Sequence, residues 1–171
     1  ADFGSISFIL ENKISPVLHG QSGLVRKGHQ SEEASYYYSL PRLATSGVFR
    51  IGAEVFQIDG TSWMDHEFFT GPEQAEVQGW DWMSLQLSDS AAIMLYLLRA
   101  QNGAILPTSA GTLIRADGSY LPFHTNDFKA APSGSWMSAK TGGKYPIIWR
   151  LQIQNYQLEL TTPVKNQELD T

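Results

Sequence analysis

Apolar and polar residues alternate along most of this chain, and the short apolar runs are interrupted by Gly, Pro, Asn and Asp. The three-to-four residue spacing of an amphipathic helix is almost absent. Alternation with frequent turn residues predicts β-strands joined by short connections. The pattern indicates an all-β, antiparallel fold of about ten strands, and a sheet of that size curls or closes into a barrel with an internal cavity.

The expected strands are separated by turn signals such as Asn102-Gly103 and Asp117-Gly118. Residues 16–30 carry Pro, three Gly and several polar side chains, which predicts an irregular linker. The expected strands lie at residues 5–10, 34–40, 46–51, 54–58, 60–69, 80–87, 92–100, 112–115, 120–123, from 128 onward, 145–154 and 157–162.

Two segments are unusual because they mix tryptophan with ionisable groups. Residues 60–69 read Gly-Thr-Ser-Trp-Met-Asp-His-Glu-Phe-Phe, and residues 79–87 read Gly-Trp-Asp-Trp-Met-Ser-Leu-Gln-Leu. A solvated loop would not carry so many aromatic side chains. We expect these segments to be neighbouring strands that line a functional site.

The second segment predicts a hairpin with residues 92–100, centred on Ser90. In that register Leu87 faces Ile93, and Asp81 faces Arg99 as a structural ion pair. The opposite face presents aromatic walls with a few polar groups, which is typical of a small-molecule pocket. The same face would equally suit packing against a second domain. Its members are Trp80, Trp82, Ser84, Gln86, Met94 and Tyr96.

Strand geometry divides the first segment between two faces. Asp65 and Glu67 share one face, with carboxylates about 7 Å apart, which is near the separation in inverting glycosidases. If Asp81 shares that face near Arg99, one carboxyl group is expected to stay protonated and to donate a proton. His66 points the other way, beside Phe68 and Trp82, where it is either a general base or proton donor, or a hydrogen-bonded core histidine.

Composition excludes several classes of function. The chain has 171 residues, a net charge of −5 and no cysteine. It has no basic run, which argues against a nucleic-acid partner, and no apolar run near the ~20 residues that span a bilayer. Its histidines lack metal-ligand spacing, and nucleotide-binding and serine-hydrolase motifs are absent, so neither a metal nor a cofactor is expected. The start at Ala1 suggests processing or excision from a longer chain.

Several motifs resemble one known family, the AttH-like, carotenoid 1,2-hydratase-related group of lipocalin-like proteins, often labelled secreted hydrolases. The motifs are Ala-Ser-Tyr-Tyr-Tyr-Ser-Leu-Pro-Arg-Leu at 34–43, Gly-Thr-Ser-Trp-Met-Asp-His-Glu at 60–67, Gly-Trp-Asp-Trp at 79–82, Met-Leu-Tyr-Leu-Leu-Arg at 94–99, Trp136, Tyr145-Pro146 with Trp149, and Asn-Gln-Glu-Leu at 166–169.

The resemblance implies a calycin-type barrel over residues 31–171, which would be a C-terminal lipocalin-like domain. Residues 1–30 would then be a junction strand and linker after an N-terminal lipocalin-like domain, a partner on the same protein. A periplasmic or secreted location follows from the resemblance alone. Asp65 and His66 match an Asp-His pair of the hydratases, whereas Phe68 stands where those enzymes have Trp.

Two hypotheses for function follow. In the first, a hydratase-type or isomerase-type enzyme transfers a proton to an apolar terpenoid, polyene or lipid, with His66, Asp65 and Glu67 as catalytic residues. In the second, the chain is a non-catalytic module that binds a lipid or another apolar ligand. A glycan hydrolase using Asp65 and Glu67 fits less well, because the cavity is expected to be apolar. The expected ligand-binding residues are Trp82, Tyr96, Phe68, Trp80, Met94, Tyr36 and Tyr38.

Overall fold

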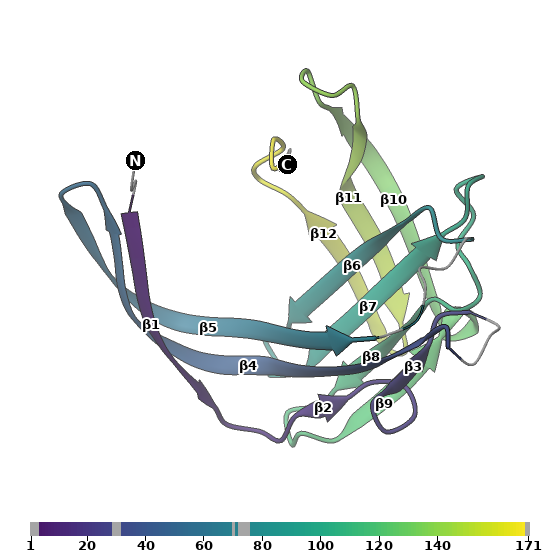
Figure 1. Ribbon diagram of the computed structural model, residues 1–171, viewed down its shortest axis with the longest axis horizontal. Helices are drawn as coiled ribbons and strands as arrows, with labels where there is room; N and C mark the ends of the chain where they lie inside the picture. Colours follow the sequence, from purple (N-terminus) through teal and green to yellow (C-terminus); the bar gives the residue numbers. More distant parts are fainter. Residues whose placement is uncertain (1–3, 29–31, 70, 72–75, 170–171) are drawn as a thin grey trace. The chain divides into compact units, whose positions relative to one another are not determined.

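The structure is a computed structural model that describes residues 4–28, 32–69, 71 and 76–169. Apart from one 3-10 turn, η1 (Thr125–Asp127), its regular elements are strands, and every strand pairing is antiparallel. The all-β antiparallel class is therefore confirmed (Figure 1). The described strands are β1 (Gly4–Asn12), β2 (Val17–Leu18), β3 (Leu24–Arg26), β4 (Ala34–Ile51), β5 (Glu54–Phe68), β6 (Gly79–Gln86), β7 (Ala92–Arg99), β8 (Ala110–Ile114), β9 (Tyr120–His124), β10 (Phe128–Met137), β11 (Lys144–Ile153) and β12 (Tyr156–Thr161).

The chain divides into two compact units, Ala1–Phe123 and His124–Thr171. In the first unit, β4 is the central strand of a five-stranded sheet, with β5 along one edge and β1, β2 and β3 along the other. The strands expected at 34–40 and 46–51 are one continuous strand, and β5 likewise merges 54–58 with the tryptophan-bearing segment. Figure 1 shows β4 and β5 as a long curved pair.

A bulge interrupts this pair where proline enters β4. The pairing of β4 with β5 shifts between Leu40 and Leu43, around Pro41. Proline has no N–H to give to a partner strand, so a bulge is where a sheet interior tolerates it. Gln86 Nε2 of β6 donates to the Pro41 carbonyl oxygen at 2.9 Å. The bulge thus presents a backbone acceptor to a strand of another sheet.

The expectation of an irregular linker at residues 16–30 is wrong for its described part. β2 and β3 are short, but both pair with the first part of β4, between Ala34 and Ser39. Val17, His19 and Val25 are buried. Because these side chains are covered, the segment belongs to the core of the first unit. Residues 29–31 lie outside the described part of the chain.

The second sheet of this unit has the order β6-β7-β8-β9. Its first hairpin keeps the expected faces but not the expected register: Asp81 pairs with Leu97 and Gly79 with Arg99, two residues from the prediction. The turn closes through Leu87 N to Ala91 O, with Ser90 at a φ of 68°. The expectation that the two tryptophan segments are neighbouring strands is also wrong, since β5 and β6 belong to different sheets.

The two sheets of the first unit pack face to face. One buried cluster joins Val25 and Tyr37 of the first sheet to the β7 side chains Met94, Tyr96 and Leu98. A second cluster joins Val17, Ala92 and Ile114. Trp63 packs against both clusters. The inner faces of the sheets therefore form one core, and the site lies at the edge of that core.

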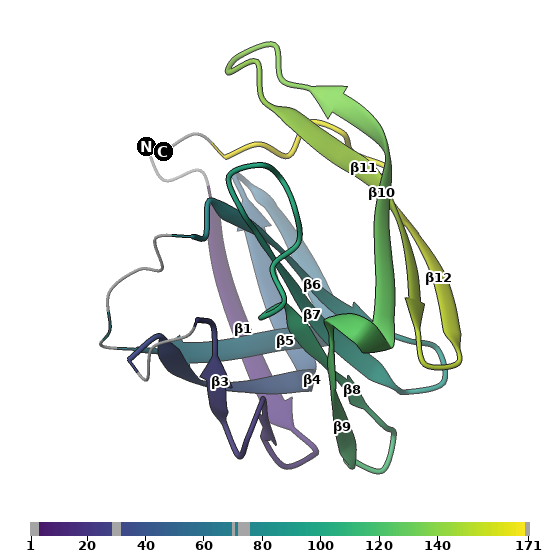
Figure 2. The ribbon, with the colours of Figure 1, turned by 90° about the vertical axis from the view of Figure 1, so that its right-hand side faces the viewer.

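The second unit is a three-stranded antiparallel sheet in the order β10-β11-β12 (Figure 2). Its last residues are tied back by Glu168, whose carboxylate accepts hydrogen bonds from Thr141 and Tyr145 at 2.5 and 2.6 Å and from Ser138. These bonds, of which the one from Ser138 has the largest effect, hold the pKa of Glu168 below its usual value. Glu168 thus fixes the end of the chain around it to the β10–β11 hairpin of its own unit. No helix in the described part of the chain is long and apolar enough to cross a membrane.

Packing at Gly111 of β8 gives a stability prediction. A Cβ there would lie 2.5 Å from the Met94 carbonyl oxygen and would overlap the Phe123 ring. We expect Gly111→Ala to lower the free energy of unfolding by about 1–3 kcal/mol, the usual cost of overpacking a core. Urea unfolding followed by tryptophan fluorescence measures it.

Gly60→Ala in β5 is the matched control, because nothing lies within 4 Å of the added methyl group. Its stability is expected to stay within about 1 kcal/mol of the parent protein. Equal unfolding midpoints for both variants would contradict the packing described for β8.

Candidate functional site

Strand alternation sorts the side chains of β4 and β5 between the two faces of their sheet. Asp65 and Glu67 share a face, as expected, and this face is the inner one, while His66 and Phe68 point outward. On the outer face Tyr36 stacks on Phe68 with ring centroids 5.7 Å apart, and Tyr38 OH lies 3.1 Å from His66 Nδ1. Tyr36 and Phe68 are about half exposed. The outward residues therefore form an aromatic surface on the side of the sheet away from the core.

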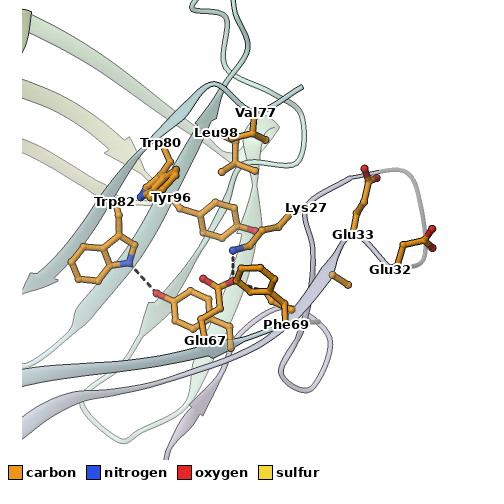
Figure 3. Close-up of a pocket in the computed structure, with 13 residues that line it drawn as sticks. Lys27, Glu32, Glu33, Glu67, Phe69, Val77, Trp80, Trp82, Tyr96 and Leu98 are labelled. Carbon is orange, nitrogen blue, oxygen red and sulfur yellow. Dashed lines mark hydrogen bonds and ion pairs between the residues drawn. The ribbon is translucent and has the colours of Figure 1, made fainter. Parts of the chain in front are cut away.

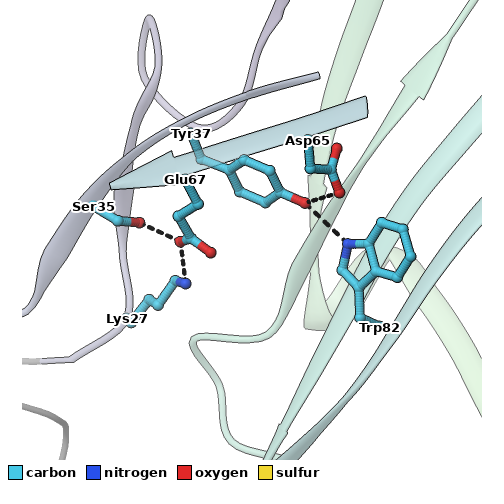
Figure 4. A network of polar contacts seen from close by, with 6 residues as sticks. All are labelled: Lys27, Ser35, Tyr37, Asp65, Glu67 and Trp82. Carbon is cyan, nitrogen blue, oxygen red and sulfur yellow. Dashed lines mark hydrogen bonds and ion pairs between the residues drawn. The ribbon is translucent and has the colours of Figure 1, made fainter. Parts of the chain in front are cut away.

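Asp65 is the centre of the hydrogen bonding on the inner face. Its Oδ1 accepts from Trp63 Nε1 at 2.7 Å and from the Ser39 hydroxyl, and its Oδ2 accepts from Tyr37 OH at 2.7 Å. Tyr37 in turn accepts from Trp82 Nε1 of β6 at 2.9 Å (Figure 4). Burial, followed by the bond to Asp65, raises the pKa of Tyr37 above its ordinary value, so this phenol keeps its proton as a donor.

A buried histidine stands behind this carboxylate. His19 Nε2 lies 2.7 Å from Ser39 Oγ, and His19 Nδ1 lies 2.8 Å from Thr112 Oγ1 of β8. Since the Ser39 hydroxyl donates to Asp65, its oxygen is left to accept from His19 Nε2–H, and Nδ1 then accepts from Thr112. Burial lowers the pKa of His19 to about 4 against a smaller opposing effect of Glu67. A neutral imidazole fits both neighbours.

Glu67 has different partners from Asp65. Its Oε1 accepts a hydrogen bond from Ser35 Oγ at 2.5 Å and forms an ion pair with Lys27 of the segment after β3. The Lys27 and Glu67 side chains are 24% and 27% exposed, so solvent reaches this pair in part. Lys27 Nζ also lies 5.8 Å from the centre of the Tyr96 ring. These contacts hold a carboxylate and an ammonium group side by side at the mouth of the core.

A pocket with a volume of about 320 Å³ opens beside this pair (Figure 3). That volume is at the lower end of the range for small-molecule sites. Trp80, Trp82 and Tyr96 form its aromatic side, as predicted from the shared face of β6 and β7, and Leu98 extends it. Trp80 is 67% exposed and Trp82 43% exposed. The remaining lining residues are Glu32, Glu33, Ala34, Phe69 and Val77, together with Lys27, Ser35, Tyr37 and Glu67.

The structure gathers some of the predicted site residues and separates others. Glu67, Trp80, Trp82 and Tyr96 line the pocket, and Asp65 lies one layer behind it, bonded to Tyr37. Met94 is fully buried in the core cluster.

Four predicted site residues lie away from the pocket. His66, Phe68, Tyr36 and Tyr38 are on the outer face, and none of them is among the pocket-lining residues. The expectation that His66 lies beside Trp82 is wrong. Glu67 points inward to the pocket that Trp82 lines, and side chains one residue apart in a strand point to opposite faces, so His66 points away from it.

The predicted ion pair between Asp81 and Arg99 is present, reached diagonally across the shifted register. It lies on the face of β6 opposite the pocket tryptophans. The predicted crowding of three carboxylates around Arg99 is wrong, because Asp65, Glu67 and Asp81 each have separate partners. In the described residues no group of three His, Asp or Glu side chains could hold a metal ion.

The sequence did not lead us to predict a place in the site for Lys27, for His19, or for the inward-pointing β4 residues Ser35, Tyr37 and Ser39. A signal for the last three existed: polar residues at alternate positions of β4 match alternate acids on β5, with Tyr37 opposite Glu67 and Ser39 opposite Asp65. His19 and Lys27 had no such signal, because they lie in the stretch interpreted as a linker.

The facing antiparallel sheets of the first unit, with an aromatic pocket at the edge of their core, fit the lipocalin-like class of fold. The family model described as AttH-like matches residues 2–171, so the chain belongs to the AttH-like family.

Two solved structures support the fold. A crystal structure from Nitrosomonas europaea, assigned to AttH, matches the whole chain with a TM-score of 0.92 and 31% identity. That of kievitone hydratase from Nectria haematococca matches with a TM-score of 0.79 and 19% identity, which shows the fold alone. The chain spans about half of each, 53% and 52%. A search of the curated proteins found no match.

The buried His19 gives a prediction about acid stability. Its pKa is about 4 in the folded chain, against an ordinary value of 6.5. Between these values the unfolded chain binds the proton more readily, so stability is lost as pH falls from 6.5 towards 4. We expect His19 to account for about 3 kcal/mol of that loss.

Urea unfolding at several pH values between 7.5 and 4 tests this contribution. His19→Gln is expected to flatten the pH dependence of the free energy of unfolding, whatever its effect at neutral pH. Identical slopes for parent and His19→Gln would show that His19 is not the group that titrates.

Proposed function

We propose that this chain carries the active site of a hydro-lyase-type enzyme, which adds water to, or removes it from, an apolar substrate by proton transfer. The observation that carries the proposal is the Glu67 carboxylate, held by Lys27 and Ser35 at the polar end of a pocket whose other side is aromatic. Membership of the AttH-like family and the fold shared with kievitone hydratase support a hydratase-type reaction.

The proton balance of such a reaction fits the paired charges. In the dehydration direction a carboxylate takes the proton of a C–H bond, the C–O bond breaks, and the leaving hydroxyl group takes a proton from a nearby donor to depart as water. Glu67 is the acceptor in this scheme, and Lys27 is the adjacent cationic donor. Hydration is the same path reversed, with the proton delivered to carbon and water adding at the neighbouring position.

The aromatic side of the pocket has a role in either direction. Positive charge that develops on a carbon chain is stabilised by the faces of tryptophan and tyrosine rings. Trp80, Trp82 and Tyr96 line the pocket and are the rings proposed for this role. Their apolar area also provides the binding energy for a terpenoid, polyene or lipid chain.

The catalytic assignment differs from the sequence hypothesis at His66 and Asp65, and it adds Lys27. His66 has no part in the proposal, because it lies on the outer face of β5 beside Tyr38. Asp65 becomes a positioning residue that orients Tyr37 and, through it, the Trp82 indole. Glu67 keeps its catalytic role. A second lipocalin-like domain on the same protein stays part of the proposal, since both solved relatives are about twice as long as this chain.

The alternative function is a non-catalytic module for apolar ligands. It is favoured by the ion pair itself, because Lys27 neutralises Glu67 and the two could serve only to close the pocket. The two functions differ in one measurable respect: the module binds ligands without converting them.

Glu67→Gln separates the two functions. In the full natural protein that carries this chain, we expect turnover to fall at least about 100-fold, the usual contribution of a general acid or base, with substrate affinity within a few-fold of the parent. The assay incubates a panel of terpenoids and polyenes in oxygen-18 water and detects labelled product by mass spectrometry.

His66→Gln, one residue away on the outer face, is the matched control and is expected to keep full activity. Unchanged turnover in Glu67→Gln, or an equal loss in both variants, would refute the assignment. Binding by the parent protein with neither a labelled hydration product nor a dehydration product from any compound would favour the non-catalytic module.

A further inference from the structure

Tyr96 has an unusual hydroxyl group. The side chain is 7% exposed and lines the pocket. No residue that the structure describes donates a hydrogen bond to its hydroxyl or accepts one from it, although Tyr37 nearby has two such bonds. Figure 3 shows the ring with its hydroxyl end directed towards Lys27. Among the described residues no fully buried side-chain nitrogen or oxygen lacks a hydrogen-bond partner, so this hydroxyl is accessible from the pocket, where a ligand oxygen can take the place of water.

A second polar atom at the same end of the pocket is also unused. Both described contacts of the Glu67 carboxylate, from Ser35 and from Lys27, go to Oε1. Oε2 has no bond to any residue in the described part of the chain. Burial, followed by the charge of Glu67, raises the pKa of Tyr96 above its ordinary value, so the phenol is a donor at neutral pH. One donor and one acceptor are therefore available together.

The charges that line the pocket limit what can bind there. Among the described lining residues Lys27 is the one cation, and Glu32, Glu33 and Glu67 are acidic. Lys27 is already paired with Glu67. Because Lys27 is already paired, a ligand carboxylate would find no unpaired cation among the described lining residues and would lie beside the Glu67 carboxylate, whereas a neutral oxygen would meet no such repulsion.

We infer that the pocket selects a neutral, oxygen-bearing apolar ligand, such as an alcohol, a phenol or a ketone, whose oxygen accepts a hydrogen bond from Tyr96. A ligand hydroxyl can also donate to Glu67 Oε2. Hydrocarbons without oxygen and fatty-acid anions are disfavoured. This inference narrows the substrate class of the proposed function. Its catalytic meaning rests on that function, but ligand selection can be measured without turnover.

Three compounds with the same isoprenoid chain test the inference: farnesol, farnesene and farnesoate. Binding to the full natural protein at pH 8 is followed by calorimetry and by the fluorescence of Trp80 and Trp82. Farnesol is expected to bind about tenfold more tightly than farnesene, the effect of one satisfied hydrogen bond, and farnesoate more weakly than farnesol by at least the same factor.

Tyr96→Phe keeps the ring and removes the hydroxyl group. It is expected to bind farnesol no better than farnesene, with farnesene affinity unchanged. Tyr36→Phe, on the outer face, is the matched control and should keep the preference. Thermal unfolding of both variants shows that the fold is retained.

Three outcomes would overturn the inference: farnesoate binding as tightly as farnesol, a preference for farnesol that survives in Tyr96→Phe, or no binding of any of the three compounds. The preference without product from any oxygenated substrate would leave the inference standing and remove the proposed function. Turnover of a pure hydrocarbon, with no preference for farnesol in binding, would remove the inference and leave the proposed function standing.

Discussion

The hydrogen bonding of Asp65 is the interaction on which the inner face depends. A carboxylate in a core is tolerated when donors surround it, and here Trp63, Tyr37 and Ser39 supply them. Through Tyr37 the network reaches Trp82 on the facing sheet, and through Ser39 it reaches His19. One half-buried carboxylate therefore sets the orientation of the Trp82 indole and of the buried His19 imidazole, and the pocket lies next to this network.

The alternation of β4 and β5 explains why neighbouring residues in one motif have unrelated roles. Asp65, His66 and Glu67 are consecutive, but the first and last point into the core and His66 points out, among Tyr36, Tyr38 and Phe68. Tyr36 contacts Phe68 and Tyr38 contacts His66 as cross-strand pairs, and His66 contacts Phe68 two residues further along β5. Proximity in sequence thus says little about function within a strand, whereas residues two apart share an environment.

Strand alternation allowed the sequence to predict the shared face of Trp80, Trp82 and Tyr96, the ion pair between Asp81 and Arg99, and the common face of Asp65 and Glu67, but not that this common face is the inner one. It could not predict which strands meet across the core, because alternation fixes faces and not partners. The hairpin register was wrong by two residues because the turn closes between Leu87 and Ala91, with Ser90 at a positive φ. Lys27 and His19 were missed because β2 and β3 are too short to show a period.

The carboxylates of Asp65 and Glu67 both point inward from β5, but their environments differ. All the described contacts of Asp65 come from groups of the fold, which use both of its oxygens. Glu67 has one oxygen occupied, is about a quarter exposed and lines the pocket. A group that is fully bonded within the fold has no capacity left to take a proton from a ligand, whereas a group with a free oxygen at a pocket has. Both acids point inward through the same strand alternation, so the difference between their environments comes from the partner that each one meets, Tyr37 for Asp65 and Lys27 for Glu67.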